Sequence, residues 1–537
     1  MRDMDTLDGI GDEYFDRHFA ADPFLAGSFG VAGFEAEVPD PSREAAAAHR
    51  AELGRLEARL DAVDGGDPVS RAVLGRLLRD GQRTLDDGLV EVAVTASIAG
   101  PFAQVISTVP VATGPDDAYL ARLGRLGGYF DAWADRYLRA AADGRFATAL
   151  GVRQAVAQVD AYLATPLQRD PLARRDSVRA EATAVIDATV RPALARFRAV
   201  LAEELLPVAR PGEKVGVGHV PGGGDGYLAL VQQYTTTHLG PEVIHRQGLE
   251  LVARLREEFA ERGGRALGTT DVAEVLGRLR DDPALRFAAG AEIVGTVTDA
   301  LRRAEAAVPD WFAGYDIAPC TVREMDPAEA ENSVLGYYLA PSADGTRPGT
   351  HVINTYRPDL RPRFEYEALA FHESVPGHHL QIALAQSRAD LPRFRRFAYF
   401  DAHGEGWGLY AERLSDEMGL YTSELSRLGM VSFDAWRACR LVVDTGLHHL
   451  GWSRDRALAY MRENTALSET NIANEVDRYI AMPGQALAYM IGRLRIDELR
   501  ERTRGSLDVR AFHHEVLAHG PLPLDVLEEL VVAAAGR

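Results

Sequence analysis

The sequence predicts a mainly α-helical protein, with a large multi-helix body and one small β hairpin or sheet. Apolar residues recur at three- and four-residue intervals between charged residues over long segments, which is typical of amphipathic helices. The composition, 46% hydrophobic and 26% charged, is that of a folded globular protein. Only one stretch, residues 315–356, contains runs typical of strands.

The clearest helical patterns lie in the first half of the chain. They cover residues 42–63, 116–141, 172–206 and 242–263. Pro41 and Ser42 are typical of a helix start, and Gly263 and Gly264 of a helix stop. The pattern becomes helical again from Arg363, with interruptions at two Pro-Gly pairs, 376–377 and 483–484.

Two stretches depart from the helical pattern. Residues 207–226 are rich in Pro and Gly, and we interpret them as a connector rather than a hinge or lid. In the second stretch, residues 322–325 and 350–356 are predicted strands, with turn residues at 341–349 between them. This β element ends shortly before the motif helix described below, and we expect it to lie beside that helix.

The chain divides into three parts by composition. We predict an N-terminal helical region at residues 1–206, a part with a loop, helices and the small β element at 207–362, and a C-terminal helical region at 363–537. Because no linker of low complexity separates them, we expect one continuous structural unit.

The charge of the chain argues against nucleic acid as a partner. Lys and Arg total 59 against 79 Asp and Glu, which gives a net charge of −20, whereas nucleic-acid surfaces need clustered cations. The one lysine, Lys214, follows Gly212-Glu213, and this sequence excludes a phosphate-binding P-loop.

Composition also bears on localisation. Cys320 and Cys439 are too few for a disulfide framework. The acidic first residues lack the features of an export signal, and no run reaches the roughly 18 to 20 apolar residues of a membrane span. We therefore expect a soluble, cytoplasmic protein with no membrane partner.

The most informative stretch is residues 371–381, Phe-His-Glu-Ser-Val-Pro-Gly-His-His-Leu-Gln. In zincin helices, HExxH places two His on one face, with the Glu as general base. His372 and Glu373 match the start of that pattern, but the next imidazoles, His378 and His379, come six and seven residues later. The sequence therefore predicts a metal site with unusual spacing.

Helix geometry leaves both later histidines open as ligands. On a straight helix His379 returns to within about 20° of His372, whereas His378 requires a kink or bulge. Pro376 supplies a reason for such a kink, because it lacks a backbone donor. We retain His378 and His379 as alternatives beside His372.

A further ligand is expected from another helix. Glu405, 33 residues after His372, would complete a site with two His and one Glu, and Glu412 follows two turns later on the same face. Glu412 is a candidate partner that orients an imidazole.

These motifs resemble a bacterial domain-of-unknown-function family numbered 885. Residues 372–381 are similar to its HExxPGHHLQ signature, and residues 405–412 to its EGWALYAE segment, with Gly408 in place of alanine. The resemblance continues through residues 444–452, 475–479, 483–489 and the final motifs. It implies a zincin-like metal-hydrolase architecture. One departure is Met490, where members commonly have lysine.

Other residues are candidates for substrate binding and catalysis. Arg478 and Tyr479, before the Pro-Gly pair 483–484, are predicted to stabilise a developing oxyanion, with His448 as the alternative. Tyr356 and His351 are candidates for lining the cleft. Three late histidines are expected to be structural: His513, His514 and His519.

The first hypothesis is a metal-dependent hydrolase, a zinc peptidase or small-amide hydrolase, using a metal-bound water with Glu373 as general base. Zn²⁺ is the expected cofactor, with another divalent metal as the alternative, and a peptide or small-molecule amide is the expected substrate. The alternatives are a biosynthetic metalloenzyme acting on a non-peptide substrate and a non-catalytic, metal-stabilised scaffold. The sequence leaves the substrate, native metal and oligomeric state open.

Overall fold

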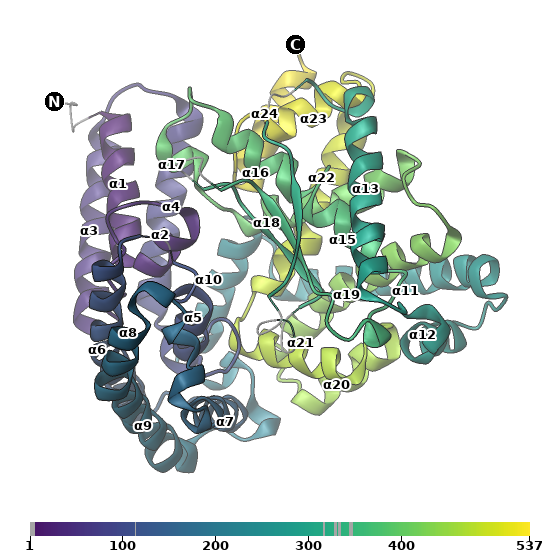
Figure 1. Cartoon of the computed structure of the whole chain (residues 1–537). Coiled ribbons are helices and arrows are strands. Elements are labelled where there is room, and N and C mark those ends of the chain that lie inside the picture. Colours follow the sequence, from purple (N-terminus) through teal and green to yellow (C-terminus); the bar gives the residue numbers. More distant parts are fainter. Residues whose placement is uncertain (1–5, 113, 315–316, 327–329, 331–333, 343–346) are drawn as a thin grey trace.

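The computed structural model describes residues 6–112, 114–314, 317–326, 330, 334–342 and 347–537. It is mainly α-helical with a three-stranded sheet, which confirms the predicted fold class. Figure 1 shows the N-terminal helices gathered on one side, the C-terminal helices on the other and the strands between them.

The N-terminal side consists of nine α-helices in the described residues. They are α1 (Leu7–Ala21), α2 (Pro23–Phe29), α3 (Arg43–Ala62), α4 (Pro68–Asp87), α5 (Pro101–Thr108), α6 (Asp116–Ala142), α7 (Ala149–Ala164), α8 (Arg179–Val185) and α9 (Arg191–Ala199). The predicted helices at 42–63 and 116–141 are confirmed as α3 and α6. Ser42 starts α3 as predicted, because its hydroxyl accepts a hydrogen bond from the Ala45 amide at 3.1 Å.

The predicted helix at 172–206 begins later than expected. Short 3₁₀ turns occupy Pro171–Ala173 and Asp176–Val178, and a continuous helical run with two π segments starts only at Arg179. Asp170 accounts for part of the difference, since its carboxylate accepts the Leu172 amide at 3.0 Å and stabilises the 3₁₀ turn there.

Four helices come between the N-terminal side and the sheet in chain order. They are α10 (Gly223–Thr235), α11 (Pro241–Leu267), α12 (Val272–Asp281) and α13 (Gly290–Trp311). Figure 1 shows three of them, α11 to α13, on the side of the C-terminal helices. The predicted stop at Gly263 is wrong, because α11 continues to Leu267 and ends at Gly268, which has a φ of 74°. Gly263 is instead a point of close packing: a Cβ there would lie 2.4 Å from a methyl group of Val275 on α12.

The predicted connector at 207–226 is held against the C-terminal side. It contains 3₁₀ turns at Gly212–Lys214 and Val217–His219 before α10 begins at Gly223. The Val217 amide donates to Nδ1 of His448 at 3.1 Å. This attachment is consistent with a connector and not with a lid.

The sheet has the strand order β1-β3-β2, with β1 (Thr321–Glu324), β2 (Gly336–Leu339) and β3 (Thr350–Ile353). β1 runs parallel to β3 and β2 antiparallel to it. The sequence predicted β1 and β3. It missed β2, whose four residues show no alternation of apolar and polar side chains. Tyr315 and residues 343–346 of the predicted β region lie outside the described residues.

The C-terminal side contains ten α-helices in the described residues. They are α15 (Tyr366–Glu373), α16 (His378–Ser387), α17 (Arg393–Arg396), α18 (Asp401–Glu417), α19 (Glu424–His448), α20 (Arg454–Asn464), α21 (Glu469–Ala481), α22 (Ala488–Thr503), α23 (Val509–Leu517) and α24 (Leu524–Ala535). α19 is buried over most of its length and contacts α11, α15, α18, α21 and α22. It is the central helix of this side of the molecule.

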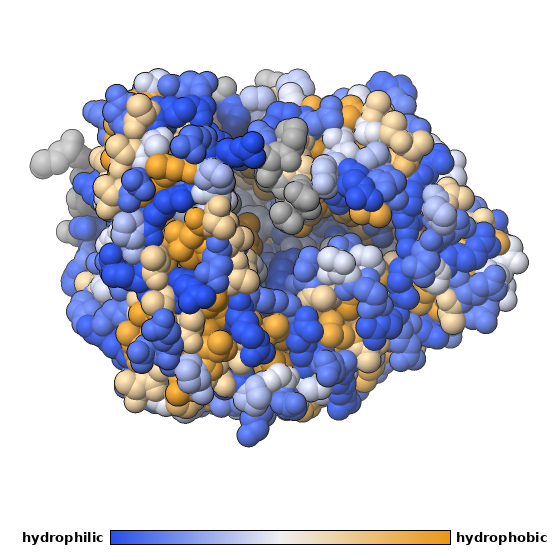
Figure 2. Space-filling model, turned by 60° about the horizontal axis from the view of Figure 1, so that its bottom comes forward, coloured by the Kyte–Doolittle hydropathy of each residue, from blue (hydrophilic) through white to orange (hydrophobic). Residues whose placement is uncertain are grey.

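Two large apolar cores stabilise the molecule. One joins α1, α3 and α4 to the C-terminal helices, and the other lies among α5 to α9. The helices at 1–206 therefore contribute to both cores, and the three-part division of the chain stays a prediction. Within the described residues, no helix combines the length and apolar character needed to cross a bilayer. Figure 2 shows a face hollowed near its centre, between the N-terminal side on the left and the C-terminal side on the right.

Candidate metal centre

The motif helix is interrupted rather than kinked. α15 ends at Glu373 and α16 begins at His378, with residues 374–377 between them. Pro376 lacks the amide hydrogen that a continuing helix would use, and its carbonyl accepts the indole N–H of Trp407 at 2.8 Å. The break lets His378 turn back, so that its ring lies 4.6 Å from that of His372, centroid to centroid.

Three side chains from three helices converge at this break. His372, His378 and Glu405 each offer one ligand atom, and these atoms lie within 4.8 Å of one another. Oε2 of Glu405 is 3.5 Å from Nε2 of His372 and 3.4 Å from Nε2 of His378. Bonds of about 2.0 to 2.1 Å to a tetrahedral ion separate two ligand atoms by about 3.4 Å. The spacing therefore fits a metal ion better than direct hydrogen bonds, which are about 2.9 Å long.

Glycine brings α18 close enough for Glu405 to reach the histidines. A Cβ at Gly408 would lie 2.6 to 2.9 Å from three ring atoms of His372, which real Cβ atoms do not tolerate. Gly408, one turn after Glu405, therefore makes room for the imidazole.

Outer partners orient two of the three side chains. Glu412, which is fully buried, accepts from Nδ1 of His372 at 2.8 Å and leaves Nε2 facing the cluster. Tyr399 donates to Oε1 of Glu405 at 3.0 Å and leaves Oε2 facing both imidazoles. The position predicted for Glu412 as an orienting partner agrees with this contact.

The electrostatics of the cluster favour a cation. Burial lowers the pKa of His372, but bonds to Glu405 and Glu412 outweigh it and raise that pKa to about 10. Burial opposes ionisation of Glu405, yet the adjacent histidines hold its pKa well below the usual value. Nδ1 of His378 and Oε2 of Glu412 are buried without hydrogen-bond partners in the described structure. Neither atom is one of the three that converge, since those are Nε2 of both histidines and Oε2 of Glu405.

His379 lies outside this cluster. Its Nδ1 is 2.9 Å from the Tyr338 hydroxyl on β2, and its Nε2 is 2.8 Å from the Ala318 carbonyl. Both ring nitrogens are therefore used to attach α16 to the sheet region. The alternative that the sequence left open is settled in favour of His378 as the histidine beside His372, because the chain breaks completely at Pro376.

Glu373 ends α15 beside the cluster and is half-buried. Burial raises the pKa of its carboxyl group, while the positive charges of His372 and His378 oppose that rise. No hydrogen bond from another described side chain holds this carboxylate, so it is available to a substrate or a water.

Two of the predicted oxyanion donors are occupied elsewhere. The Tyr479 hydroxyl donates to Glu475 at 2.6 Å and accepts from Arg440, and the side chain is fully buried. His448 accepts from the Val217 amide and donates to the Tyr479 carbonyl at 2.9 Å, which uses both ring nitrogens. The structure therefore gives these two residues packing and hydrogen-bonding roles instead of the predicted catalytic ones.

Arg478, the third predicted oxyanion donor, is also engaged by neighbouring side chains. It donates to Oε1 of Gln485 at 2.8 Å and to the Tyr489 hydroxyl at 3.4 Å. Tyr489 is partly exposed, and the charge of Glu405 contributes to raising its pKa, after burial. Arg478 therefore contacts Tyr489, a residue that the sequence analysis did not single out as a site candidate.

The remaining candidates lie at the edges of this region. His351 on β3 is fully buried, with Nδ1 3.0 Å from the Ser374 hydroxyl in the break between α15 and α16. Tyr356 is exposed. His513 bonds the Tyr410 hydroxyl and the Trp311 carbonyl, a packing role.

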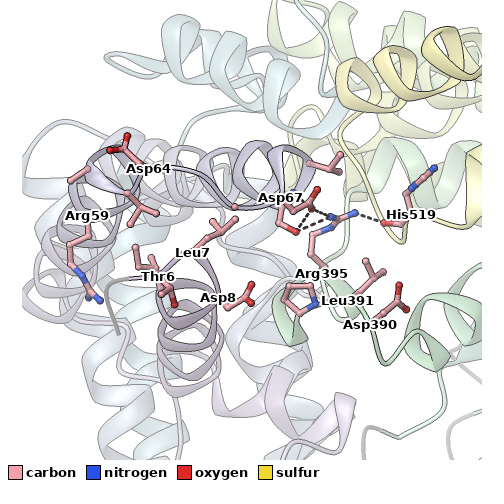
Figure 3. A pocket seen from close by; sticks show the side chains of 17 residues that line it. Thr6, Leu7, Asp8, Arg59, Asp64, Asp67, Asp390, Leu391, Arg395 and His519 are labelled. Atoms are coloured by element: carbon pink, nitrogen blue, oxygen red, sulfur yellow. Dashed lines mark hydrogen bonds and ion pairs between the residues drawn. The ribbon is translucent and has the colours of Figure 1, made fainter. Parts of the chain in front are cut away.

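A cleft lies elsewhere, between the start of α1 and the segment around α17. It has a volume of about 820 Å³, and its lining includes four aspartates: Asp8, Asp64, Asp67 and Asp390. Figure 3 shows Arg395 reaching Asp67 and the His519 backbone at one side of it. Neither the cluster nor Glu373 lines this cleft.

Two solved structures are similar to the chain over nearly its whole length. The crystal structure titled “putative lipoprotein” from Colwellia psychrerythraea matches with a TM-score of 0.92 at 25% identity and covers 99% of both chains. A “putative lipoprotein of unknown function” from Shewanella oneidensis matches with a TM-score of 0.76 at 15% identity, covering 98% of this chain and 100% of its own, and shows the fold alone. No curated protein matches the chain.

The family that the histidine motif resembles matches almost the whole chain and not the motif alone. The family described as bacterial protein of unknown function (DUF885) matches residues 23–531, which includes both sides of the molecule and all three converging side chains. The chain belongs to this family.

Proposed function

We propose that the protein is a metal-dependent hydrolase that cleaves amide bonds, a zinc peptidase or small-amide hydrolase. The observation that carries the proposal is the convergence of His372, His378 and Glu405 at tetrahedral ligand spacing, beside an unpaired glutamate. Three protein ligands are the number that catalytic zinc sites use, since a fourth position must stay open. A divalent ion held there would supply Lewis-acid polarisation of a carbonyl group and acidify water.

Glu373 is the proposed general base. It accepts a proton from the attacking water as the new C–O bond forms, and it delivers that proton to the amine nitrogen as the C–N bond breaks. The products are a carboxylic acid and an amine, so one water is consumed for each bond cleaved. Burial, which raises the pKa of Glu373, increases its strength as a base.

Tyr489 is the proposed donor to the developing oxyanion. Its hydroxyl accepts from Arg478, which polarises the O–H group, and the side chain is partly exposed near Glu405. It takes the role that the sequence had suggested for Tyr479.

The biosynthetic alternative rested on Met490 in place of lysine. Met490 is fully buried in the apolar core, so it offers no contact to a substrate. Amide hydrolysis therefore remains the better-supported proposal.

The test combines metal analysis with turnover. The purified protein is stripped with a chelator, reloaded with Zn²⁺, Mn²⁺ or Co²⁺, and assayed against short peptides and N-acyl amino acids. We expect one equivalent of bound metal and metal-dependent hydrolysis, both lost in His372→Ala.

His238→Ala is the matched control, because His238 is exposed and has no described role at the cluster. It should retain both metal and turnover. Stoichiometric metal without hydrolysis of any amide would favour the scaffold alternative and overturn the proposal.

A further inference from the structure

Two arginines stand one turn apart on the buried helix α19. Arg437 is 5% exposed and Arg440 is 2% exposed. Nε and Nη1 of Arg437, and Nη1 of Arg440, are buried without hydrogen-bond partners in the described structure. Residues three apart on a helix share a face, so the unpaired N–H groups lie on the same side of α19.

Arg437 is the less satisfied of the two. Among the described residues, none forms a hydrogen bond with its guanidinium and no carboxylate lies within 4.0 Å of it. The faces of the guanidinium are covered, because its central carbon lies 4.3 Å from the Phe433 ring and 4.2 Å from the Trp436 ring. The edge of the guanidinium, which carries the N–H donors, has no hydrogen-bond partner among the described residues.

Each of the other buried arginines in the described residues forms at least one hydrogen bond. Arg136, for example, donates to the Glu91 carboxylate and to the Pro41 carbonyl. A buried guanidinium without a partner costs free energy, which a ligand anion would recover. The exception at Arg437 therefore points to a ligand and not to the fold alone.

The unpaired N–H groups of Arg437 lie on a helix that packs against the proposed catalytic groups. α19 packs directly against α15 and α18, which carry Glu373 and Glu405. The positive charge of Arg437 partly offsets the burial that raises the pKa of Glu373. Arg440 stacks 4.4 Å from the ring of Tyr489, the proposed oxyanion donor. The two arginines thus adjoin the same site.

Glu365 is a second charge facing Arg437. It is buried at the start of α15, accepts from Ser432 at 3.3 Å, and burial raises its pKa to about 7. Because that carboxyl group is not within ion-pair distance, it does not occupy the donors of Arg437.

We propose that Arg437 binds a carboxylate of the substrate, so that the protein acts on N-acyl α-amino acids, the group that also forms the C-terminal end of a peptide. The inference rests on the proposed amide hydrolysis and names its substrate class. A guanidinium fork binds a carboxylate through two parallel N–H donors, on Nε and Nη2 or on Nη1 and Nη2, and no described residue occupies any of these nitrogens of Arg437.

The chemistry of such a substrate suits the position of the arginine. The carboxylate is on the amine side of the scissile bond, so Arg437 would hold the leaving amino acid while Glu373 protonates its nitrogen. Hydrolysis of this substrate releases a free amino acid from the carboxyl end, which corresponds to exopeptidase or aminoacylase action.

The first experiment measures binding, with N-acetyl-phenylalanine and N-acetyl-phenylalanine amide as probes of equal shape that differ in the carboxylate. Calorimetry with the zinc-loaded Glu373→Gln protein, which is expected to bind the probes without hydrolysing them, should show about 10- to 100-fold tighter binding of the acid, as expected for a hydrogen-bonded charge pair. Equal binding of the two probes, or binding of neither, overturns the inference.

Variants locate the preference. Arg437→Met should remove the preference by weakening binding of the acid without changing that of the amide, and Arg437→Lys should retain part of it. Arg462→Met is the matched control, because Arg462 is an exposed arginine paired with Glu469, and it should bind both probes like the native protein. Equal weakening of both probes in Arg437→Met would indicate a structural role and overturn the inference.

The binding result is independent of turnover. If the acid is preferred but no amide is hydrolysed, the proposed function fails and the carboxylate subsite stands. If amides are hydrolysed without preference for a free carboxylate, the proposed function stands and the inference fails. Turnover of N-acetyl-phenylalanine is then compared with turnover of a short peptide that ends in a free phenylalanine carboxylate. Preference for the first indicates an acylase, and preference for the second a carboxypeptidase.

Discussion

Two buried histidines, His372 and His448, lie in settings that look alike in the sequence but differ in the structure. Each is at the C-terminal end of a helix, and each is almost inaccessible to solvent. His448 donates and accepts backbone hydrogen bonds with both ring nitrogens, and burial lowers its pKa to about 4. His372 uses only Nδ1 for a strong bond, to Glu412, and its Nε2 faces Glu405 and His378.

The difference shows where chemistry is available in this molecule. Around His448 the buried polar atoms satisfy one another: Asp444, one turn earlier, accepts from the Tyr227 hydroxyl at 2.6 Å and from the Gly484 amide at 3.1 Å. Around His372 several polar atoms remain without partners. The first region is internally satisfied, whereas the second has polar atoms left for the ligand that we propose.

The largest expected effect is at the proposed base. Glu373→Gln keeps the size and polarity of the side chain but removes its capacity to accept a proton, so kcat for amide hydrolysis should fall by about 10²- to 10⁴-fold. Bound zinc, measured by elemental analysis, should stay at one equivalent, because Glu373 is not among the converging ligands. Undiminished turnover would remove Glu373 from the mechanism.

Removal of the His448 ring should lower the stability of the fold and leave the metal content unchanged. His448→Ala leaves the Val217 amide and the Tyr479 carbonyl without their partner, and we expect a loss of about 2 to 4 kcal/mol in the free energy of unfolding. Chemical denaturation measures this loss. Zinc content per folded molecule should not change, and loss of zinc without loss of stability would reverse the distinction between the two histidines.

Glu412→Gln tests the orienting bond to His372. Because an amide is a weaker acceptor than a carboxylate, zinc affinity should fall by about 10- to 100-fold, measured by competition with a chromophoric chelator. Glu417→Gln is the control on the same helix, since Glu417 makes only an exposed ion pair, with Arg500. Equal affinities in the two variants would contradict an orienting role for Glu412.

The burial of Asp444 predicts an effect on stability that depends on pH. Burial raises its pKa from 3.8 to about 7 in the folded state. Below pH 4 the carboxyl group is protonated in both states, and between about pH 4 and 7 only the unfolded state ionises, so stability falls as pH rises across this window and levels above it.

Denaturation of Asp444→Asn should show a shallower decline across the same window, with a difference of about 4 kcal/mol between its ends, as a pKa shift of about three units requires. An unchanged pH profile would show that Asp444 is ionised in the folded protein.

Several elements followed from local sequence alone. Ser42 and the charged, amphipathic segment after it defined α3 closely, because capping and helical periodicity act over a few residues. The stop at Gly263 was wrong because packing against Val275, a contact with another helix, explains that glycine. β2 was missed because a four-residue strand is defined by its partner β3 more than by its own pattern.

The candidate site was predictable in part. The residue types and the order of His372, Glu373 and Glu405 were sufficient to propose a metal site, and so was the position of Glu412. The choice between His378 and His379 was not, since it depends on a break whose geometry involves Trp407 on another helix. Tyr399, Tyr489 and Arg437 were missed because each is defined by contacts across helices far apart in the chain.

The sequence by itself determined the helical class, the family and the short list of candidate metal ligands, because each depends on residue types at short spacings. Only the tertiary structure decided which polar atoms are consumed by neighbours and which remain. Whether a buried polar group has a hydrogen-bond partner depends on how the helices pack around it. Neighbouring groups accept the donors of Tyr479 and His448, whereas no described residue accepts those of Arg437.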